Sequence, residues 1–170
     1  MIAAWGVDSH TILAAYMAVE KELIEATLVG DEKMILSVCK EHNLDCSKFN
    51  IVHCPVDIKS ASLAVEMINK GKGDFLMKGL ISTDRYMKAI LNKECGLMDP
   101  GAIFSNVTVT ESKHYHKLLI VGDVAIIPLP DLNQKIAITN YLIRTANLLG
   151  IENPKVGLLS ASEQTLPKIT

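Results

Sequence analysis

Asp74-Phe75-Leu76-Met77-Lys78-Gly79, followed directly by Leu80-Ile81-Ser82-Thr83, is the stretch that best indicates the fold. Its apolar run ends at a lysine and a glycine, which is typical of a short strand that leads into a tight turn. The glycine would let the backbone approach a ligand closely. Ser82 and Thr83 offer side-chain oxygens that can cap a helix, which we expect to continue to about Asn92.

The same alternation of strand and helix occurs three times before this stretch. Apolar runs predict strands at Ile2–Val7, Ala26–Gly30 and Asn50–Cys54. The helical period predicts three helices: one from Asp8-Ser9 to about Leu23, one with an apolar stripe at Met34, Ile35 and Val38, and one over Ser60–Asn69. Four such steps joined by short loops favour an α/β fold with a mostly parallel sheet and helices on both faces. Ligands of such sheets bind beyond the C-terminal ends of the strands.

The pattern changes after Pro100. Asn106–Thr110 and Lys117–Val121 are close enough in sequence to predict an antiparallel pair of strands. A long helix is expected from about Asp131 to Gly150, and a last strand at Val156–Leu159 with Ser160-Ala161-Ser162-Glu163 at its C-terminal end. We therefore expect residues 1–100 to form part of a first lobe and residues 101–170 to begin a second lobe.

Composition narrows the classes of function. Seventeen basic and nineteen acidic residues give a formal charge of −2, which argues against a nucleic-acid partner. No apolar stretch is long enough for a bilayer span and no signal-peptide pattern is present, so we expect no membrane partner and a cytoplasmic location. The four cysteines have neither zinc-site nor disulfide spacing, which predicts no metal and mostly buried, reduced thiols.

The turn after Lys78 carries the residue types that phosphate recognition requires. Lys78 ends a strand, and Ser82 and Thr83 lie at a helix start, where free N–H groups and the helix dipole favour an anion. Arg85 and Lys88 follow one turn apart and could add two cations to one face. A capped helix with a solvated basic face is the more common reason for such a pattern.

Asp123 follows the apolar strand Lys117–Val121 and a glycine. A carboxylate at this place could accept a proton or hold a positive group. An aspartate that bonds its own backbone in a turn is the more common explanation.

Beyond these local patterns, the chain resembles the phosphate acetyltransferase and phosphate butyryltransferase family, the butyryl branch more closely. The matching pieces keep the family's order and spacing along almost the whole chain: Leu28-Val29-Gly30-Asp31, Phe75-Leu76-Met77-Lys78-Gly79-Leu80 with Thr83, Leu91-Asn92-Lys93-Glu94 with Gly96-Leu97, Ser105 with Val107, Asp123-Val124-Ala125, Pro130 with Leu132 and Lys135, and Gly150-Ile151-Glu152-Asn153-Pro154-Lys155-Val156.

The resemblance implies reversible acyl transfer between coenzyme A and inorganic phosphate. It implies a two-lobed architecture like that of isocitrate and isopropylmalate dehydrogenases, and assembly as a homo-oligomer, commonly a dimer. Acyl-CoA and phosphate would be the partners, with coenzyme A as substrate or product and no bound cofactor. The implied catalytic residues are Lys78, Thr83 and Asp123. The implied residues for binding phosphate or coenzyme A are Ser82, Thr83, Arg85, Lys88 and Ser105.

Three positions depart from the family pattern. Lys88 stands where the family usually has arginine, Asn106 stands where the butyryl branch commonly has histidine, and Ile127 stands where asparagine is usual. The chain also ends about where the family's second half begins, so we expect a fragment or a truncated relative with little activity of its own. Two alternatives stay open: a non-catalytic ligand-binding or assembly subunit, and an enzyme of related fold such as a reductase component that releases acetyl phosphate.

Overall fold

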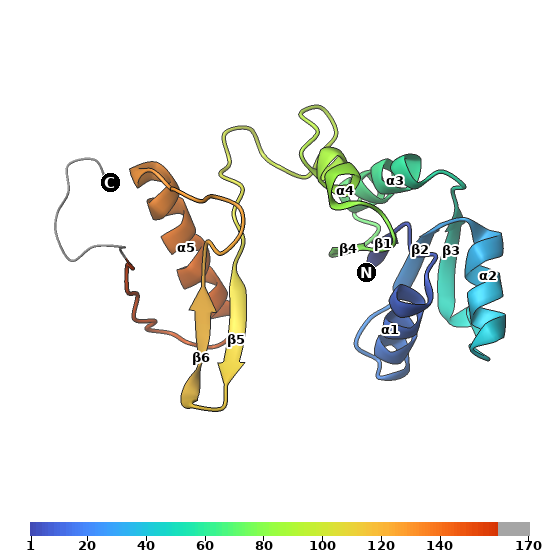
Figure 1. Ribbon diagram of the computed structural model, residues 1–170, viewed down its shortest axis with the longest axis horizontal. Coiled ribbons are helices and arrows are strands. Elements are labelled where there is room, and N and C mark those ends of the chain that lie inside the picture. The colour runs from blue at the N-terminus through green and yellow to red at the C-terminus, as the bar shows by residue number, and fades with distance from the viewer. Residues whose placement is uncertain (160–170) are drawn as a thin grey trace. The chain divides into compact units, whose positions relative to one another are not determined.

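The computed structural model describes residues 1–159 and divides them into two compact units (Figure 1). The first unit is Met1–Pro100 and the second begins at Gly101. Residues 1–159 contain no helix whose length and apolar content would let it cross a membrane.

The first unit contains a four-stranded parallel sheet. Its strands are β1 (Ile2–Ala4), β2 (Ala26–Gly30), β3 (Phe49–His53) and β4 (Leu76–Lys78). The strand order is β3-β2-β1-β4, and every neighbouring pair is parallel. Ala4 therefore lies between Val29 on one side and Lys78 on the other. The predicted parallel α/β sheet is confirmed.

Four α-helices cover both faces of this sheet (Figure 1). They are α1 (Ser9–Glu20), α2 (Glu32–Glu41), α3 (Asp57–Asn69) and α4 (Thr83–Ile90). A short 3-10 helix, η1, consists of Cys46–Lys48. Successive residues of β1 point to opposite faces. Ala3 packs with α1 and α2, whereas Ile2 and Ala4 pack with α3. The two cores explain why β1 is buried throughout.

The ends of several elements differ from the expected ones. The first strand stops at Ala4 instead of Val7, because Trp5 turns the chain with a φ of 55°. The first helix ends at Glu20 and α4 ends at Ile90, each earlier than its apolar pattern suggested. The helix expected from Ser60 begins three residues earlier, at Asp57.

The second unit consists of an antiparallel hairpin and one long helix. Strand β5 (Thr108–Ser112) pairs with β6 (Tyr115–Val121), so the predicted antiparallel pair is confirmed. Helix α5 (Leu132–Leu148) starts with a capping box between Asp131 and Gln134. The Tyr141 hydroxyl donates a 2.9 Å hydrogen bond to the carbonyl of Ile103, which ties α5 to the segment before β5.

The strand predicted at Val156–Leu159 is wrong. These residues form no strand, and Val156 and Gly157 instead line a hollow of about 700 Å³ beside β6 and α5. An apolar run becomes a strand only where a neighbouring strand offers free N–H and C=O groups, and here no such pairing forms. Ser160-Ala161-Ser162-Glu163 lies outside the described residues.

Candidate functional site

The candidate site lies at the C-terminal edge of the parallel sheet, beside β1 and β4. The chain leaves β1 for α1 on one face of the sheet and leaves β4 for α4 on the other face. Between two strands whose connections diverge in this way, the sheet leaves a crevice that α/β proteins use for ligands. The segments Trp5–Asp8 and Gly79–Ser82 border this position.

Gly79 brings the turn after β4 against the end of β1. The Gly79 nitrogen donates a hydrogen bond of 2.9 Å to the Ala4 carbonyl, and the Leu80 nitrogen donates one of 2.9 Å to the Trp5 carbonyl. A Cβ atom on Gly79 would lie 2.3 Å from the Trp5 carbonyl oxygen. The close approach that we expected to serve a ligand is thus made to the protein's own backbone.

Ser82 caps α4, as the sequence predicts. Its hydroxyl accepts a 3.3 Å hydrogen bond from the backbone nitrogen of Arg85. Thr83 is the first residue of α4, and both hydroxyl residues are exposed. The N-terminal turn of α4 therefore presents backbone N–H groups and two hydroxyls at the ligand-binding edge of the sheet.

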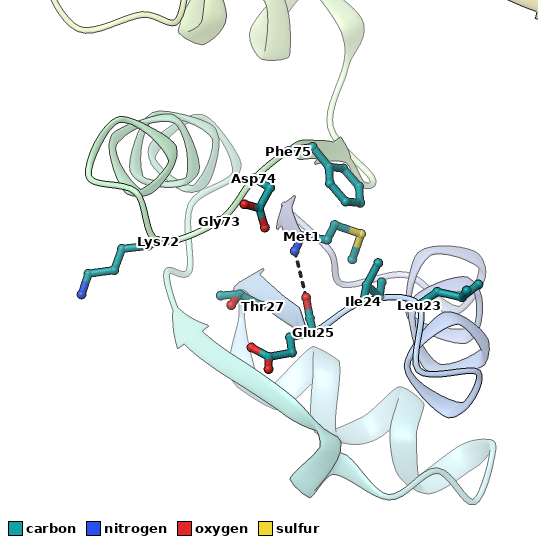
Figure 2. Close-up of a pocket in the computed structure, with 9 residues that line it drawn as sticks. All are labelled: Met1, Leu23, Ile24, Glu25, Thr27, Lys72, Gly73, Asp74 and Phe75. Carbon is teal, nitrogen blue, oxygen red and sulfur yellow. Dashed lines mark hydrogen bonds between the residues drawn. The ribbon is translucent and has the colours of Figure 1, made fainter. Parts of the chain in front are cut away.

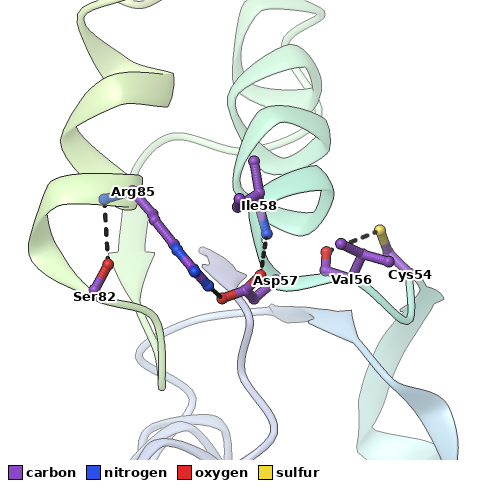
Figure 3. Close-up of polar contacts among 6 residues, drawn as sticks. All are labelled: Cys54, Val56, Asp57, Ile58, Ser82 and Arg85. Atoms are coloured by element: carbon purple, nitrogen blue, oxygen red, sulfur yellow. Dashed lines mark hydrogen bonds and ion pairs between the residues drawn. The ribbon is translucent and has the colours of Figure 1, made fainter.

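Two of the expected phosphate-binding cations are paired with carboxylates. Arg85 forms an ion pair with Asp57, the first residue of α3 (Figure 3). Lys88 forms an ion pair with Asp84, 3.0 Å apart, within α4. Lys78 belongs to no ion pair among residues 1–159, and its ammonium group makes a weak 3.5 Å contact to the Gly79 carbonyl. Lys78 is thus the site cation whose charge is least compensated.

The N-terminus of α3 shares this site with α4. Val56 precedes α3 without a side-chain cap, and one Asp57 carboxylate oxygen accepts a 2.7 Å hydrogen bond from the Ile58 nitrogen. Figure 3 shows the other oxygen of this carboxylate, Oδ2, directed at the Arg85 guanidinium. The Asp57 carboxylate therefore bridges the first turns of two neighbouring helices.

Asp57 was not among the residues that the sequence suggested. The predicted helix began at Ser60, which left Asp57 in a loop, whereas the structure places it in the first turn of α3. A signal was present: Pro55 follows the preceding strand, and an acidic residue soon after a proline is typical of a helix start.

Ser105 and Asp123 meet in the second unit. The Ser105 hydroxyl donates a 2.9 Å hydrogen bond to one Asp123 carboxylate oxygen. The other oxygen accepts hydrogen bonds from the backbone nitrogens of Ala125 (2.8 Å) and Ile126 (2.7 Å). The Asn106 side chain accepts a 3.0 Å hydrogen bond from the Val124 nitrogen in the same turn.

These contacts determine the charge of Asp123. Partial burial raises its pKa, but the hydrogen bonds from Ile126, Ala125 and Ser105 together outweigh burial and leave the pKa below its ordinary value. A carboxylate with a lowered pKa is a weak proton acceptor near neutral pH. The turn-forming explanation accounts for the observed geometry of Asp123.

A second hollow lies at the opposite, N-terminal edge of the sheet (Figure 2). It has a volume of about 280 Å³, and its walls are the segments that precede β1, β2 and β4. The Met1 nitrogen donates a 2.8 Å hydrogen bond to the Glu25 carbonyl at its rim. Since parallel sheets bind ligands at the other edge, we do not assign the acyl-transfer site to this hollow.

No group of three or more His, Cys, Asp or Glu side chains within residues 1–159 is arranged to hold a metal ion.

Comparison with known proteins identifies the family. Residues 52–170 match the family model for phosphate acetyl/butaryl transferase, and this range includes every candidate site residue. The chain belongs to this family. The resemblance noted in the sequence is thereby confirmed, and the matched range begins in β3 and includes α3, α4 and the second unit.

Individual members of the phosphate acetyl/butaryl transferase family match over nearly the whole chain. Phosphate butyryltransferase from Clostridium acetobutylicum is 38% identical over 162 residues, which are 95% of this chain and 54% of the relative. Phosphate acetyltransferase from Thermotoga maritima is 35% identical, with the same coverage of 95% and 54%. The chain thus spans about half the length of the curated relatives it matches.

A solved structure confirms the fold. A branched-chain phosphotransacylase from Enterococcus faecalis V583 superposes with a TM-score of 0.78 and 26% sequence identity. The match covers 98% of this chain and 58% of that chain. Both units of the present structure therefore have counterparts in the fold of that protein.

Proposed function

We propose that this chain supplies the phosphate-binding part of an acyltransferase that interconverts acyl-CoA plus phosphate with acyl phosphate plus coenzyme A. A phosphate butyryltransferase-like activity is the specific form we favour, given the 38% identity to the relative of that name. The observation that carries the proposal is the start of α4, where two hydroxyls and backbone N–H groups lie at the C-terminal edge of the sheet, the edge at which Lys78 ends β4; all of these residues are inside the matched range.

The proposed roles follow from the contacts. Ser82, Thr83 and the first turn of α4 would receive phosphate oxygens, and Lys78 would supply positive charge. Arg85 and Lys88 would add charge once released from their carboxylate partners. Asp123 would orient the Ser105 hydroxyl as an ionised acceptor, which is a more limited role than proton transfer.

The reaction requires a phosphate oxygen to attack the thioester carbonyl carbon. The carbon–sulfur bond then breaks, and coenzyme A leaves as a thiolate. The protein must hold a phosphate oxygen over the face of the thioester carbonyl and stabilise the oxyanion that forms. Residues 1–159 offer groups for the first task, and we assign none of them to the second. We therefore expect little turnover from this chain alone, since catalytic groups act jointly.

Phosphate binding is the direct test. Isothermal titration of inorganic phosphate should show binding that weakens in a Thr83→Ala, Lys88→Ala double variant. Lys70→Ala is a matched control, because Lys70 is also an exposed lysine paired with a carboxylate four residues away. Unchanged phosphate binding in the double variant, or an equal loss in Lys70→Ala, would contradict the proposed site.

A second candidate function is a ligand-binding or assembly subunit without catalysis. The carboxylate pairing of Arg85 and Lys88 favours it, because two of the expected cations are already compensated. Following thiol release from acetyl- and butyryl-CoA in the presence of phosphate separates the two functions. Weak turnover above the uncatalysed rate would support the acyltransferase, whereas phosphate binding with no turnover would support the subunit. Turnover on the order of 10 per second, typical of enzymes, would show that the catalytic groups lie within this chain and would contradict the low turnover expected above.

We also propose that the chain assembles as a homo-oligomer and is located in the cytoplasm. Exposed apolar side chains on β6 and α5, among them Leu118, Leu119 and Ile136, support a homo-oligomer, with a dimer as the simplest form. The free cysteines and the acyl-CoA substrate support a cytoplasmic location. Sedimentation tests the first point, and a freely soluble monomer would contradict it.

A further inference from the structure

The ion pair between Asp57 and Arg85 places a carboxylate inside the proposed phosphate site. Asp57 lies in the first turn of α3 and Arg85 in the first turn of α4, and the two residues are 28 positions apart in the sequence. The Arg85 side chain is 49% exposed and that of Asp57 is 25% exposed. The pair therefore lies at the surface, where a dissolved anion can reach the guanidinium.

The Asp57 carboxylate has the contacts of a bound anion. It accepts a hydrogen bond from a backbone N–H at the start of α3, and it pairs with a guanidinium at the start of α4 (Figure 3). Backbone N–H groups at helix starts and an arginine are also what a phosphate group would use. A phosphate bound at the start of α4 would therefore compete with Asp57 for the Arg85 guanidinium.

From these contacts we propose that Asp57 acts as an internal competitor for phosphate and holds Arg85 until a dianion displaces it. The inference rests on the proposed function, because it assumes that phosphate binds at the start of α4. A free monoanion carries no more charge than the carboxylate it must replace, whereas Asp57 is held beside Arg85 at a high effective concentration. Phosphate dianion carries twice that charge, so the ion pair selects phosphate over monoanions such as chloride and acetate.

Asp57→Asn tests this competition in the full chain. Asparagine keeps an oxygen for the Ile58 nitrogen and removes the charge that holds Arg85. We expect the affinity for inorganic phosphate to rise about two- to fivefold, the range that a surface ion pair can supply. We also expect chloride and acetate to inhibit phosphate binding more strongly in the variant than in the unaltered chain.

Glu66→Gln is the matched control. It removes the same charge from the same helix, but Glu66 pairs with Lys70 one turn away instead of with Arg85. Its phosphate affinity should stay within measurement error of the unaltered chain. Asp57→Ser, which also retains an oxygen at the helix start, provides a second test if Asp57→Asn does not fold as judged by circular dichroism.

A double-mutant cycle with Arg85→Ala separates competition from simple charge removal. If Asp57 only repels phosphate through space, Asp57→Asn raises the affinity equally in the Arg85 and Arg85→Ala backgrounds. Competition predicts a clearly larger rise when Arg85 is present, because only then is an ion pair broken on binding.

The outcomes separate this inference from the proposed function. The inference is supported if Asp57→Asn raises the phosphate affinity only, or mainly, when Arg85 is present. Phosphate binding that appears only in Asp57→Asn supports it as well. An equal rise in both backgrounds, no rise, or a fall in affinity overturns it while leaving phosphate binding at this site intact. If no variant binds phosphate, both the inference and the proposed phosphate site are wrong.

Discussion

The hydroxyl of Ser60 donates a 2.8 Å hydrogen bond to the carbonyl of Val29, which joins α3 to the C-terminal end of β2. The same hydroxyl oxygen accepts a 3.0 Å hydrogen bond from the Trp5 nitrogen, at the point where β1 ends. Ser60 is fully buried. One side chain therefore connects a helix to the ends of two strands, next to the edge that carries the candidate site.

Ser60→Ala should lower the free energy of unfolding by about 1–3 kcal/mol, because the partly buried Trp5 N–H loses its acceptor. Denaturant unfolding followed by the fluorescence of Trp5, the single tryptophan, measures this loss in the first unit. Ser62→Ala is the control, since the exposed Ser62 hydroxyl bonds only to the Ile58 carbonyl of its own helix. A loss of the same size in both variants would contradict the role given to Ser60.

Gly79→Ala should destabilise the first unit by about 1–3 kcal/mol, because the new methyl group has no room beside the Trp5 carbonyl. The same fluorescence measurement detects this loss of stability, since the new methyl group would displace Trp5 itself. Leu80→Ala, which shortens an exposed neighbouring side chain, should change stability by less than about 0.5 kcal/mol. Unchanged stability of Gly79→Ala would mean that the two turns do not approach as the structure has them.

The stabilisation that Asp8 gives to the first unit should be lost in acid. Burial raises its pKa, but hydrogen bonds from the Thr11 hydroxyl (2.6 Å) and the Thr11 nitrogen (3.0 Å) outweigh burial and lower it below the ordinary 3.8. Because the folded pKa lies below the unfolded one, the stabilisation is complete above pH 3.8 and is lost as the pH falls through the folded pKa.

Asp8→Ala removes the N-cap of α1 and should cost about 0.5–2 kcal/mol at neutral pH. The difference from the unaltered chain should shrink in unfolding experiments below pH 3.8. Asp8→Asn keeps a capping oxygen, so it should retain most of the neutral stability while losing this pH dependence. A pH-independent loss in Asp8→Ala would show that the ionised carboxylate does not contribute.

The four thiols should differ in reactivity. Cys95 is exposed, whereas Cys39 is fully buried, and burial together with the neighbouring Cys46 raises the Cys39 pKa to about 12. Because the thiolate is the reactive form, Cys95 should label first with iodoacetamide at pH 8, and Cys39 should label only on unfolding. Peptide mass spectrometry identifies the labelled site. Early labelling of Cys39 would contradict its place in the core.

Local patterns were sufficient for much of the fold. The apolar runs located the four parallel strands, and the side-chain oxygens at Asp8 and Ser82 marked two helix starts. The hairpin of β5 and β6 followed from the short distance between two alternating segments. These features depend on residues a few positions apart, so their energetics are present in the sequence itself.

The sequence by itself also determined the family, through ordered motifs, and the residue types available for binding phosphate. Only the tertiary structure decided which polar groups meet. Arg85 pairs with Asp57 from a different helix, and Asp123 accepts a hydrogen bond from Ser105, which is 18 residues away in the sequence. It also decided that Gly79 lies against the backbone of Trp5, with no room for a side chain, and that residues 156–159 form no strand. The reason is that ion pairs, close backbone approaches and strand pairing depend on partners distant in the chain, whose positions no local pattern specifies.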